Sequence, residues 1–213
     1  MKILCLHGLR HSGDMMKKSM KDLIRKFAKK EIEFDFYTSP IKFTSEISPE
    51  TDKLAESENE YFQWWSGTRE TGLTLEKYDT IEQSINNVLG KWNSDQYDGI
   101  LGFSQGSVLT QIFTYQIQNK IIDTYEPKFI ILAGASSISD TVYKQYYKDT
   151  LKYPVVFIAG MRDTLVTLDI TNELRKYFDP NKTLFLIHNG GHYVSTSTEI
   201  MYPLLAFINS KKN

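Results

Sequence analysis

The nine residues 99–107 read Gly99-Ile-Leu-Gly-Phe-Ser-Gln-Gly-Ser107 and set Ser104 between two glycines. An apolar run precedes this serine, and a segment with a helical pattern follows it. A nucleophile elbow has this arrangement, with a strand, a serine on a sharp turn and then a helix. The pattern alone is weak evidence, because glycine and serine are common residues. The rest of the chain therefore has to supply the strands, an acid and a histidine in the right order.

Short apolar runs alternate along the chain with helical patterns. The apolar runs are residues 3–6, 34–37, 99–103, 129–133, 155–159 and 184–187. Most are continuously apolar, which is typical of strands buried on both faces of a parallel sheet. Apolar residues at helical spacing mark segments 15–29, 76–92, 104–118, 168–177 and 199–210. This alternation predicts an α/β fold with a mostly parallel, six-stranded sheet flanked by helices.

The composition is that of an ordinary globular protein. The chain has 213 residues, of which 41% are hydrophobic and 24% charged, and its formal net charge is −1. This balance gives no sign of a surface for nucleic acid or anionic membranes. The single cysteine, Cys5, lies in an apolar run and is expected to be a buried thiol, which fits a cytoplasmic location. The apolar runs are too short for a membrane span or a signal peptide.

Two residues downstream of Ser104 could complete a hydrolytic site. The histidines after the elbow lie in His188-Asn-Gly-Gly-His192, and His192 follows a predicted strand where a general base would lie. Asp163 follows the strand at 155–159 and could orient that base. The rival acids are Asp140, Asp149 and Asp169. Asp163 is favoured because catalytic residues lie just past strand ends, and the order Ser104, Asp163, His192 is that of α/β-hydrolases.

An oxyanion hole needs two N–H donors. The amide of Gln105, the residue after the serine, is expected to be one of them. The loop after the first predicted strand should supply the other, and the amide of Leu9 is the candidate. His188 is expected to hold the Gly-Gly loop by a hydrogen bond rather than to take part in the chemistry.

Residues 40–73 interrupt the alternation and show no clear period. Residues 44–61 contain six acidic residues against one lysine, and the pair Trp64-Trp65 follows shortly after. One interpretation is a solvated acidic loop that its aromatic residues anchor to the core. The other is a lid or pocket wall, with Trp64 or Trp65 lining the acyl pocket. We expect one domain over residues 1–213, with 40–73 as an insertion or lid-like segment.

Four motifs together carry a family resemblance. They are LCLHGLRHSGD at 4–14, YDGILGFSQGS at 97–107, AGMRDTLV at 159–166 and HNGGHYV at 188–194. With these motifs in this order, the chain resembles the FSH family of serine hydrolases, small α/β-hydrolases related to the fungal FSH proteins and to the ovarian-cancer-associated candidate hydrolase. The pair Trp64-Trp65 is also similar to an aromatic segment of that family.

The resemblance implies a cofactor-free, cytosolic hydrolase of carboxylic esters with the α/β-hydrolase fold and no metal. Its catalytic triad would be Ser104, Asp163 and His192. His11 stands where the family has glutamine, beside the proposed oxyanion donor, and could narrow the acyl site. Ser107 and Ser195 replace a usual alanine and a frequent proline. These departures concern substrate preference and leave the triad intact.

Three alternatives remain open. Acyl-protein thioesterases share the LHGL and GFSQG patterns, and thioesters and oxygen esters use the same triad, so only kinetics separates them. A catalytically silent, hydrolase-like binding module is the second. The third is a metal site built from the pairs His7/His11 and His188/His192 with Asp163. It is disfavoured because these pairs span glycine loops rather than one helix face.

Overall fold

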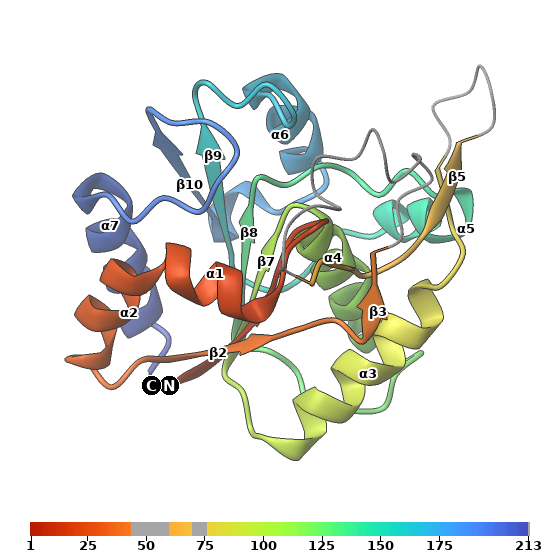
Figure 1. Cartoon of the computed structure of the whole chain (residues 1–213), viewed down its shortest axis with the longest axis horizontal. Coiled ribbons are helices and arrows are strands. Elements are labelled where there is room, and N and C mark those ends of the chain that lie inside the picture. The colour runs from red at the N-terminus through yellow and green to blue at the C-terminus, as the bar shows by residue number, and fades with distance from the viewer. Residues whose placement is uncertain (44–59, 70–75, 213) are drawn as a thin grey trace.

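The computed structural model describes residues 1–43, 60–69 and 76–212. Its centre is a six-stranded sheet with the order β10-β9-β8-β7-β1-β2 (Figure 1). The strands are β1 (Lys2–Leu6), β2 (Glu33–Tyr37), β7 (Gly99–Phe103), β8 (Phe129–Ala133), β9 (Val155–Gly160) and β10 (Thr183–His188). Every neighbouring pair is parallel. All six predicted strands are confirmed, and their carboxyl ends meet at one edge of the sheet.

Helices cover both faces of this sheet (Figure 1). One face packs on α1 (Gly13–Ser19), α2 (Lys21–Ala28) and α7 (Thr198–Asn209). The other packs on α3 (Ile81–Ser94), α4 (Gln105–Gln118) and α6 (Leu168–Arg175). In β1, Ile3 and Cys5 point to the first face, whereas Leu4 and Leu6 point to the second. Burial on both faces is the reason why the strands are continuously apolar.

Two predicted helices differ from those observed. The segment 15–29 holds two helices, because Met20, with φ −98° and ψ 11°, leaves the helical region between α1 and α2. The segment 76–92 begins with a strand, β6 (Glu76–Tyr78), and helix α3 starts only at Ile81. Tyr78 is buried and continues the apolar spacing of α3 into an extended backbone. The apolar periodicity therefore predicted a helix that begins about one turn before the observed start of α3 at Ile81.

The remaining elements are short and were not predicted. Strand β3 (Ile41–Lys42) pairs antiparallel with β4 (Phe62–Gln63), and β5 (Gly67–Arg69) pairs in the same way with β6. A short helix α5 (Thr141–Lys144) continues into η1 (Gln145–Lys148), and η2 (Pro180–Lys182) precedes β10. Strands of two or three residues carry too little pattern for sequence-based recognition.

Much of the predicted insertion at 40–73 lies outside the described residues, including nearly all of its acidic stretch. Phe62, in the described part of this segment, forms an antiparallel β-bridge with His11 in the loop that follows β1. Glu60 pairs with Lys42 at 2.5 Å on the surface. The lid-like role and the single-domain boundary stay predictions.

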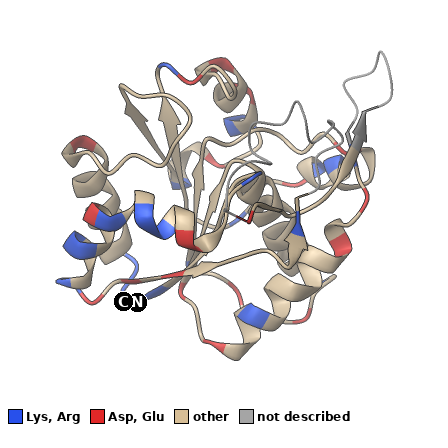
Figure 2. Cartoon of the chain, in the orientation of Figure 1, with Lys and Arg blue, Asp and Glu red and all other residues tan. Residues whose placement is uncertain are grey.

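The surface carries both signs of charge. In Figure 2, both basic and acidic residues occur along the ribbon of helices α1 and α2, in keeping with the near-neutral net charge. None of the helices in the described ranges is both long and apolar enough to cross a membrane. Cys5 is a buried free thiol, as expected, and burial raises its pKa well above the usual value.

Candidate active site

Ser104 occupies a sharp turn between β7 and α4. Its backbone has φ 52° and ψ −118°, a strained conformation for a residue with a side chain. Its N–H donates to the carbonyl of Ala133 at 2.9 Å. A Cβ atom at Gly102 or at Gly106 would lie 2.3 Å from a backbone oxygen. The two glycines of the motif are therefore required by close approach of the backbone, and the turn has the geometry of an elbow.

Two further predicted residues lie beside this serine. His192 Nε2 is 2.9 Å from Ser104 Oγ, and His192 Nδ1 is 2.6 Å from Asp163 Oδ2. A carboxylate only accepts hydrogen bonds, so Nδ1 carries the proton and Nε2 is free to accept the serine hydroxyl proton. The side chain of Asp163 is 1% exposed and that of His192 is 16% exposed. The structure thus brings together three residues that follow β7, β9 and β10.

The loop of Asp163 is tied to the loop of His192. The N–H of Met161 donates to the His188 carbonyl at 2.8 Å, and the N–H of Arg162 donates to the Gly190 carbonyl at 2.9 Å. Asp163 Oδ1 accepts from the backbone N–H groups of Leu165 and Val166. These bonds hold the loops of Asp163 and His192 next to each other, because both loops continue neighbouring parallel strands.

His188 makes the hydrogen bond to the Gly-Gly loop that was expected of it. Its side chain is buried, and Nδ1 accepts a hydrogen bond from the Gly190 N–H at 3.1 Å. Burial lowers the pKa of His188, which favours the neutral ring that can accept this bond. The Gly-Gly loop before His192 is therefore fixed from inside the protein.

The rival acids lie in or beside α5, η1 and α6. Asp140 caps α5 through the Val142 N–H and also accepts from the Tyr78 N–H. Asp149 follows η1. Asp169 lies in the first turn of α6, and the side chain of Thr167 accepts the capping bond of this helix from the Ile170 N–H. Of the four acids considered, Asp163 is the one that contacts His192.

The loop after β1 runs directly beside the serine. A Cβ atom at Gly8 would lie 3.2 Å from Ser104 Cβ, and the next residue, Leu9, is 48% exposed. His7 is fully buried, with Nδ1 2.7 Å from the Gly8 carbonyl and Nε2 accepting from the Ser39 N–H at 3.0 Å. Burial lowers the pKa of His7 to about 4. The imidazole is thus neutral near pH 7 and shapes the loop that carries Leu9.

The other candidate pocket residues flank this loop. His11 is partly exposed, and burial lowers its pKa. Trp64 is fully buried with its ring 4.8 Å from that of His7, and Trp65 is 6% exposed and packs on Tyr78. The two indoles lie near the site but are interior side chains, so a role as pocket wall stays a prediction.

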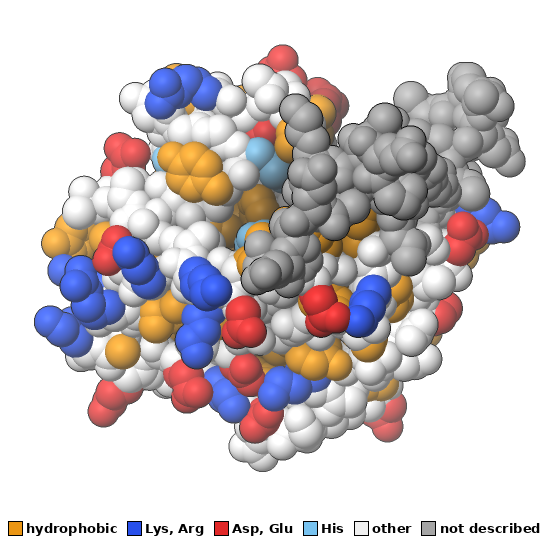
Figure 3. Space-filling model, in the orientation of Figure 1, with side chains coloured by type: hydrophobic (Ala, Val, Ile, Leu, Met, Phe, Trp, Pro, Cys, Tyr) orange, Lys and Arg blue, Asp and Glu red, His pale blue; other side chains and the backbone are white. Residues whose placement is uncertain are grey.

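Sequence reasoning missed two residues that contact His192. The ring of Phe103 lies 4.9 Å from the imidazole, and Gly134 lies against its edge. Each stands at the end of a predicted strand, and that position is the only signal that could have drawn attention to them. In Figure 3, histidine side chains reach the surface near the middle of the face, with hydrophobic side chains around them.

One histidine of each pair considered as metal ligands bonds to other partners. His7 bonds to Ser39 and His192 bonds to Ser104 and Asp163. Within residues 1–43, 60–69 and 76–212, no group of three or more His, Cys, Asp or Glu side chains could hold a metal ion.

Solved structures with a similar fold define the class. Acyl-protein thioesterase 2 of Zea mays matches with a TM-score of 0.66 and 17% identity, over 99% of this chain and 93% of that one. At this identity the likeness concerns the fold alone. The sheet order, the elbow and the loops past the strand ends are those of an α/β-hydrolase, as expected.

Sequence comparisons give the family. The chain is 26% identical over 219 residues to "Esterase CG5412" of Drosophila melanogaster, covering 99% of this chain and 74% of that protein. It is 23% identical over 211 residues to "Esterase OVCA2" of Danio rerio, covering 93% and 92%. The model of the family "Serine hydrolase (FSH1)" matches residues 1–203. The chain therefore belongs to the FSH1 serine hydrolase family, as its motifs indicated, and is a hydrolase.

Proposed function

We propose that the protein cleaves carboxylic esters through an acyl-enzyme on Ser104. The observation that supports this most strongly is the continuous hydrogen-bonded chain from Ser104 Oγ through His192 to Asp163, with contacts of 2.9 and 2.6 Å. A serine hydroxyl is a weak nucleophile unless a base accepts its proton, and an orienting acid fixes the tautomer of that base. The three side chains supply these functions at hydrogen-bonding distance.

The reaction starts when Ser104 Oγ attacks the acyl carbonyl while His192 Nε2 accepts the hydroxyl proton. Asp163 stabilises the imidazolium that forms. The tetrahedral intermediate collapses as His192 returns the proton to the leaving alcohol, and the acyl group stays on Ser104. A water molecule then attacks this acyl group with His192 as base. The second tetrahedral intermediate collapses as His192 returns the proton to Ser104 Oγ, and the carboxylic acid leaves.

The backbone N–H groups of Leu9 and Gln105 would bind the oxyanion. Gln105 begins α4, so its N–H lies at the helix end where partial positive charge gathers. The loop of Leu9 passes beside Ser104, as the close approach of Gly8 indicates. Two donors aimed at the substrate's carbonyl oxygen would stabilise the negative charge that develops on that oxygen in the transition state.

The substrate would be a small-molecule ester. Curated relatives carry the name esterase, which favours an oxygen ester, whereas a solved structure of similar fold is an acyl-protein thioesterase. A thioester is therefore the second candidate, and the same three residues would cleave it. The buried thiol of Cys5 is free, which is consistent with a location of the protein in the reducing cytoplasm.

A kinetic comparison tests the proposal. Purified wild-type protein is assayed with p-nitrophenyl esters of graded acyl length and with matched acyl thioesters. Ser104→Ala should lower kcat about 10⁴-fold on every substrate that the wild type cleaves. A Ser104→Ala protein that kept most of its activity would exclude Ser104 as nucleophile. A folded wild type without turnover on either panel would favour the binding-module alternative.

A further inference from the structure

The side chain of Gln105 bonds to a segment far back in the chain. Its Oε1 accepts from the Trp64 N–H at 2.8 Å, and its Nε2 donates to the Trp65 carbonyl at 3.0 Å. A carboxamide can accept and donate at once, and only one orientation of the amide satisfies both of these bonds. The first residue of α4 is therefore held from outside its own helix.

Trp64 extends this connection to the loop that follows β1. Its indole N–H donates to the His7 carbonyl at 2.7 Å, and its own carbonyl accepts from the Ser84 hydroxyl. The indole is fully buried, so these bonds are shielded from water. Trp64 consequently links the loop of His7, Gly8 and Leu9 to the start of α4.

We infer that Trp64 and the Gln105 side chain form a brace that positions the two proposed oxyanion donors relative to each other. The inference rests on the proposed function, in which the N–H groups of Leu9 and Gln105 bind one oxygen atom. Such donors act only when they lie about 2.7–3.1 Å from the position that the oxyanion will occupy. Leu9 lies beyond the last residue of β1 and is half exposed, so the strand ladder does not fix its amide. The brace supplies this constraint.

Two substitutions break the brace at different points. Gln105→Met keeps the length of the side chain but removes both hydrogen bonds. Trp64→Phe keeps a buried ring but removes the N–H that reaches the His7 carbonyl. Each should lower kcat for p-nitrophenyl butyrate about 10- to 100-fold, because a misplaced donor stabilises the transition state poorly. The KM should change less than about threefold, because ester binding in the ground state does not use these donors fully.

A transition-state analogue separates positioning from stability. An alkyl trifluoromethyl ketone forms a tetrahedral adduct on the active serine, with an oxyanion in the place of the intermediate's oxyanion. Its inhibition constant should rise in each variant by about the same factor by which kcat/KM falls. A merely structural role would lower the melting temperature without this proportionality.

Gln111→Met is the matched control. Gln111 is another glutamine of α4, buried where Gln105 is partly exposed, with Oε1 accepting from the Tyr147 hydroxyl at 2.5 Å and Nε2 donating to the Ser107 and Ser136 carbonyls at 3.2 and 3.0 Å. The Gln111→Met variant likewise loses every hydrogen bond of a side-chain amide, one accepted and two donated, but none of them involves Trp64. Its kcat and its affinity for the ketone should stay near wild type, even if its melting temperature falls.

The outcomes distinguish the brace from the proposed function. Full activity of both Gln105→Met and Trp64→Phe, or losses no larger than that of Gln111→Met, would overturn the brace while an inactive Ser104→Ala keeps the proposed function intact. Esterase activity that survives in Ser104→Ala would overturn the proposed function itself, and the brace with it.

Discussion

Gly134 stands at the end of β8, against the ring of the proposed general base. Its φ of +51° lies in the left-handed region that favours glycine. A Cβ atom there would lie 2.9 Å from His192 Cε1 and 3.1 Å from Nδ1. Gly134→Ala should therefore turn the imidazole away from Ser104 and lower kcat about 10- to 100-fold. Steady-state kinetics on the best p-nitrophenyl ester would measure this loss.

The control for this substitution is Gly90→Ala. Gly90 lies inside α3, and a Cβ atom there would have no other atom within 4 Å. Alanine should leave kcat unchanged and raise the free energy of unfolding by about 0.5–1 kcal/mol, because it costs less chain entropy than glycine in a helix. Equal activity of Gly134→Ala and Gly90→Ala would contradict the steric role assigned to Gly134.

The contacts of some single residues can be predicted from the sequence, and those of others cannot. Ser104, Asp163 and His192 could be predicted to meet, because each follows a strand and a parallel sheet gathers the carboxyl ends of its strands. Trp64 could not be placed in the same way. Its partners are the carbonyl of His7 and the side chain of Gln105, and no local spacing reports contacts between such distant segments.

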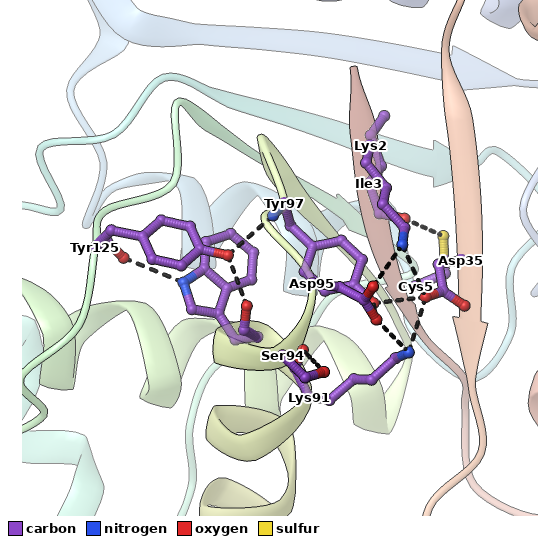
Figure 4. Close-up of polar contacts among 10 residues, drawn as sticks. Lys2, Ile3, Cys5, Asp35, Lys91, Ser94, Asp95, Tyr97 and Tyr125 are labelled. Atoms are coloured by element: carbon purple, nitrogen blue, oxygen red, sulfur yellow. Dashed lines mark hydrogen bonds and ion pairs between the residues drawn. The ribbon is translucent and has the colours of Figure 1, made fainter.

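At the scale of elements, a partly buried ion cluster ties the end of α3 to β1 and β2 (Figure 4). Lys91 lies 3.1 Å from Asp35 and 2.8 Å from Asp95, and Lys2 lies 3.1 Å from Asp95. The Tyr97 hydroxyl donates to Asp35 at 2.5 Å. The side chains of Lys2, Asp35 and Lys91 are only about a quarter exposed, so their charges depend on one another more than an isolated surface pair does.

Removal of the Lys91 charge should destabilise the protein. Lys91→Met leaves Asp35 and Asp95 facing each other without this cation, and the free energy of unfolding should fall by about 1–2 kcal/mol. Urea denaturation would measure the change. Lys176→Met is the control, because the Lys176–Glu173 pair is about two-thirds exposed and should contribute less than about 0.5 kcal/mol. The kcat should be unaffected, because Lys2 begins β1 and the cluster lies at the opposite strand ends from Ser104. Equal losses in the two variants would contradict the account.

Strands were easier to predict than helix boundaries, for a physical reason. A strand buried on both faces is apolar throughout, and the flanking turn residues end that run clearly. A helix boundary depends on the backbone, as at Met20, where the apolar spacing continues although the helix is interrupted. Tyr78 shows the same effect. Its ring packs on Trp65, so it stands as an aromatic residue at a position that continues the apolar spacing of α3, although its backbone is extended.

For the whole molecule, acid should act in two stages. Burial lowers the pKa of His7 to about 4, and it also lowers the pKa values of His11 and His188. Between pH 6.5 and 4 the unfolded chain therefore binds protons that the folded protein does not, and stability falls as the pH falls. The shift at His7 alone corresponds to about 3 kcal/mol.

The second stage comes from carboxylates. The hydrogen bond from Lys91 lowers the pKa of Asp95 to about 2. Burial alone would raise the pKa of Asp35, but its bonds to Tyr97 and Lys91 lower it overall. Both groups stabilise the fold above their unfolded pKa near 3.9, and this stability is lost as the pH falls toward 2.

Urea denaturation at steps from pH 7 to about pH 2 would measure both stages. In His7→Gln the loss between pH 6.5 and 4 should be smaller, and the loss below pH 4 should be unchanged. Identical slopes in wild type and His7→Gln above pH 4 would contradict the assignment of the first stage to His7.

The central claim is that Ser104 is an activated nucleophile, and covalent labelling tests it most directly. Wild type, Ser104→Ala and His192→Ala would each be treated with a fluorophosphonate, and the adduct would be located by peptide mass mapping. We predict one adduct on Ser104 of the wild type, none in Ser104→Ala and strongly slowed labelling in His192→Ala. An unlabelled but folded wild type, or an adduct that persists in Ser104→Ala, would contradict the claim.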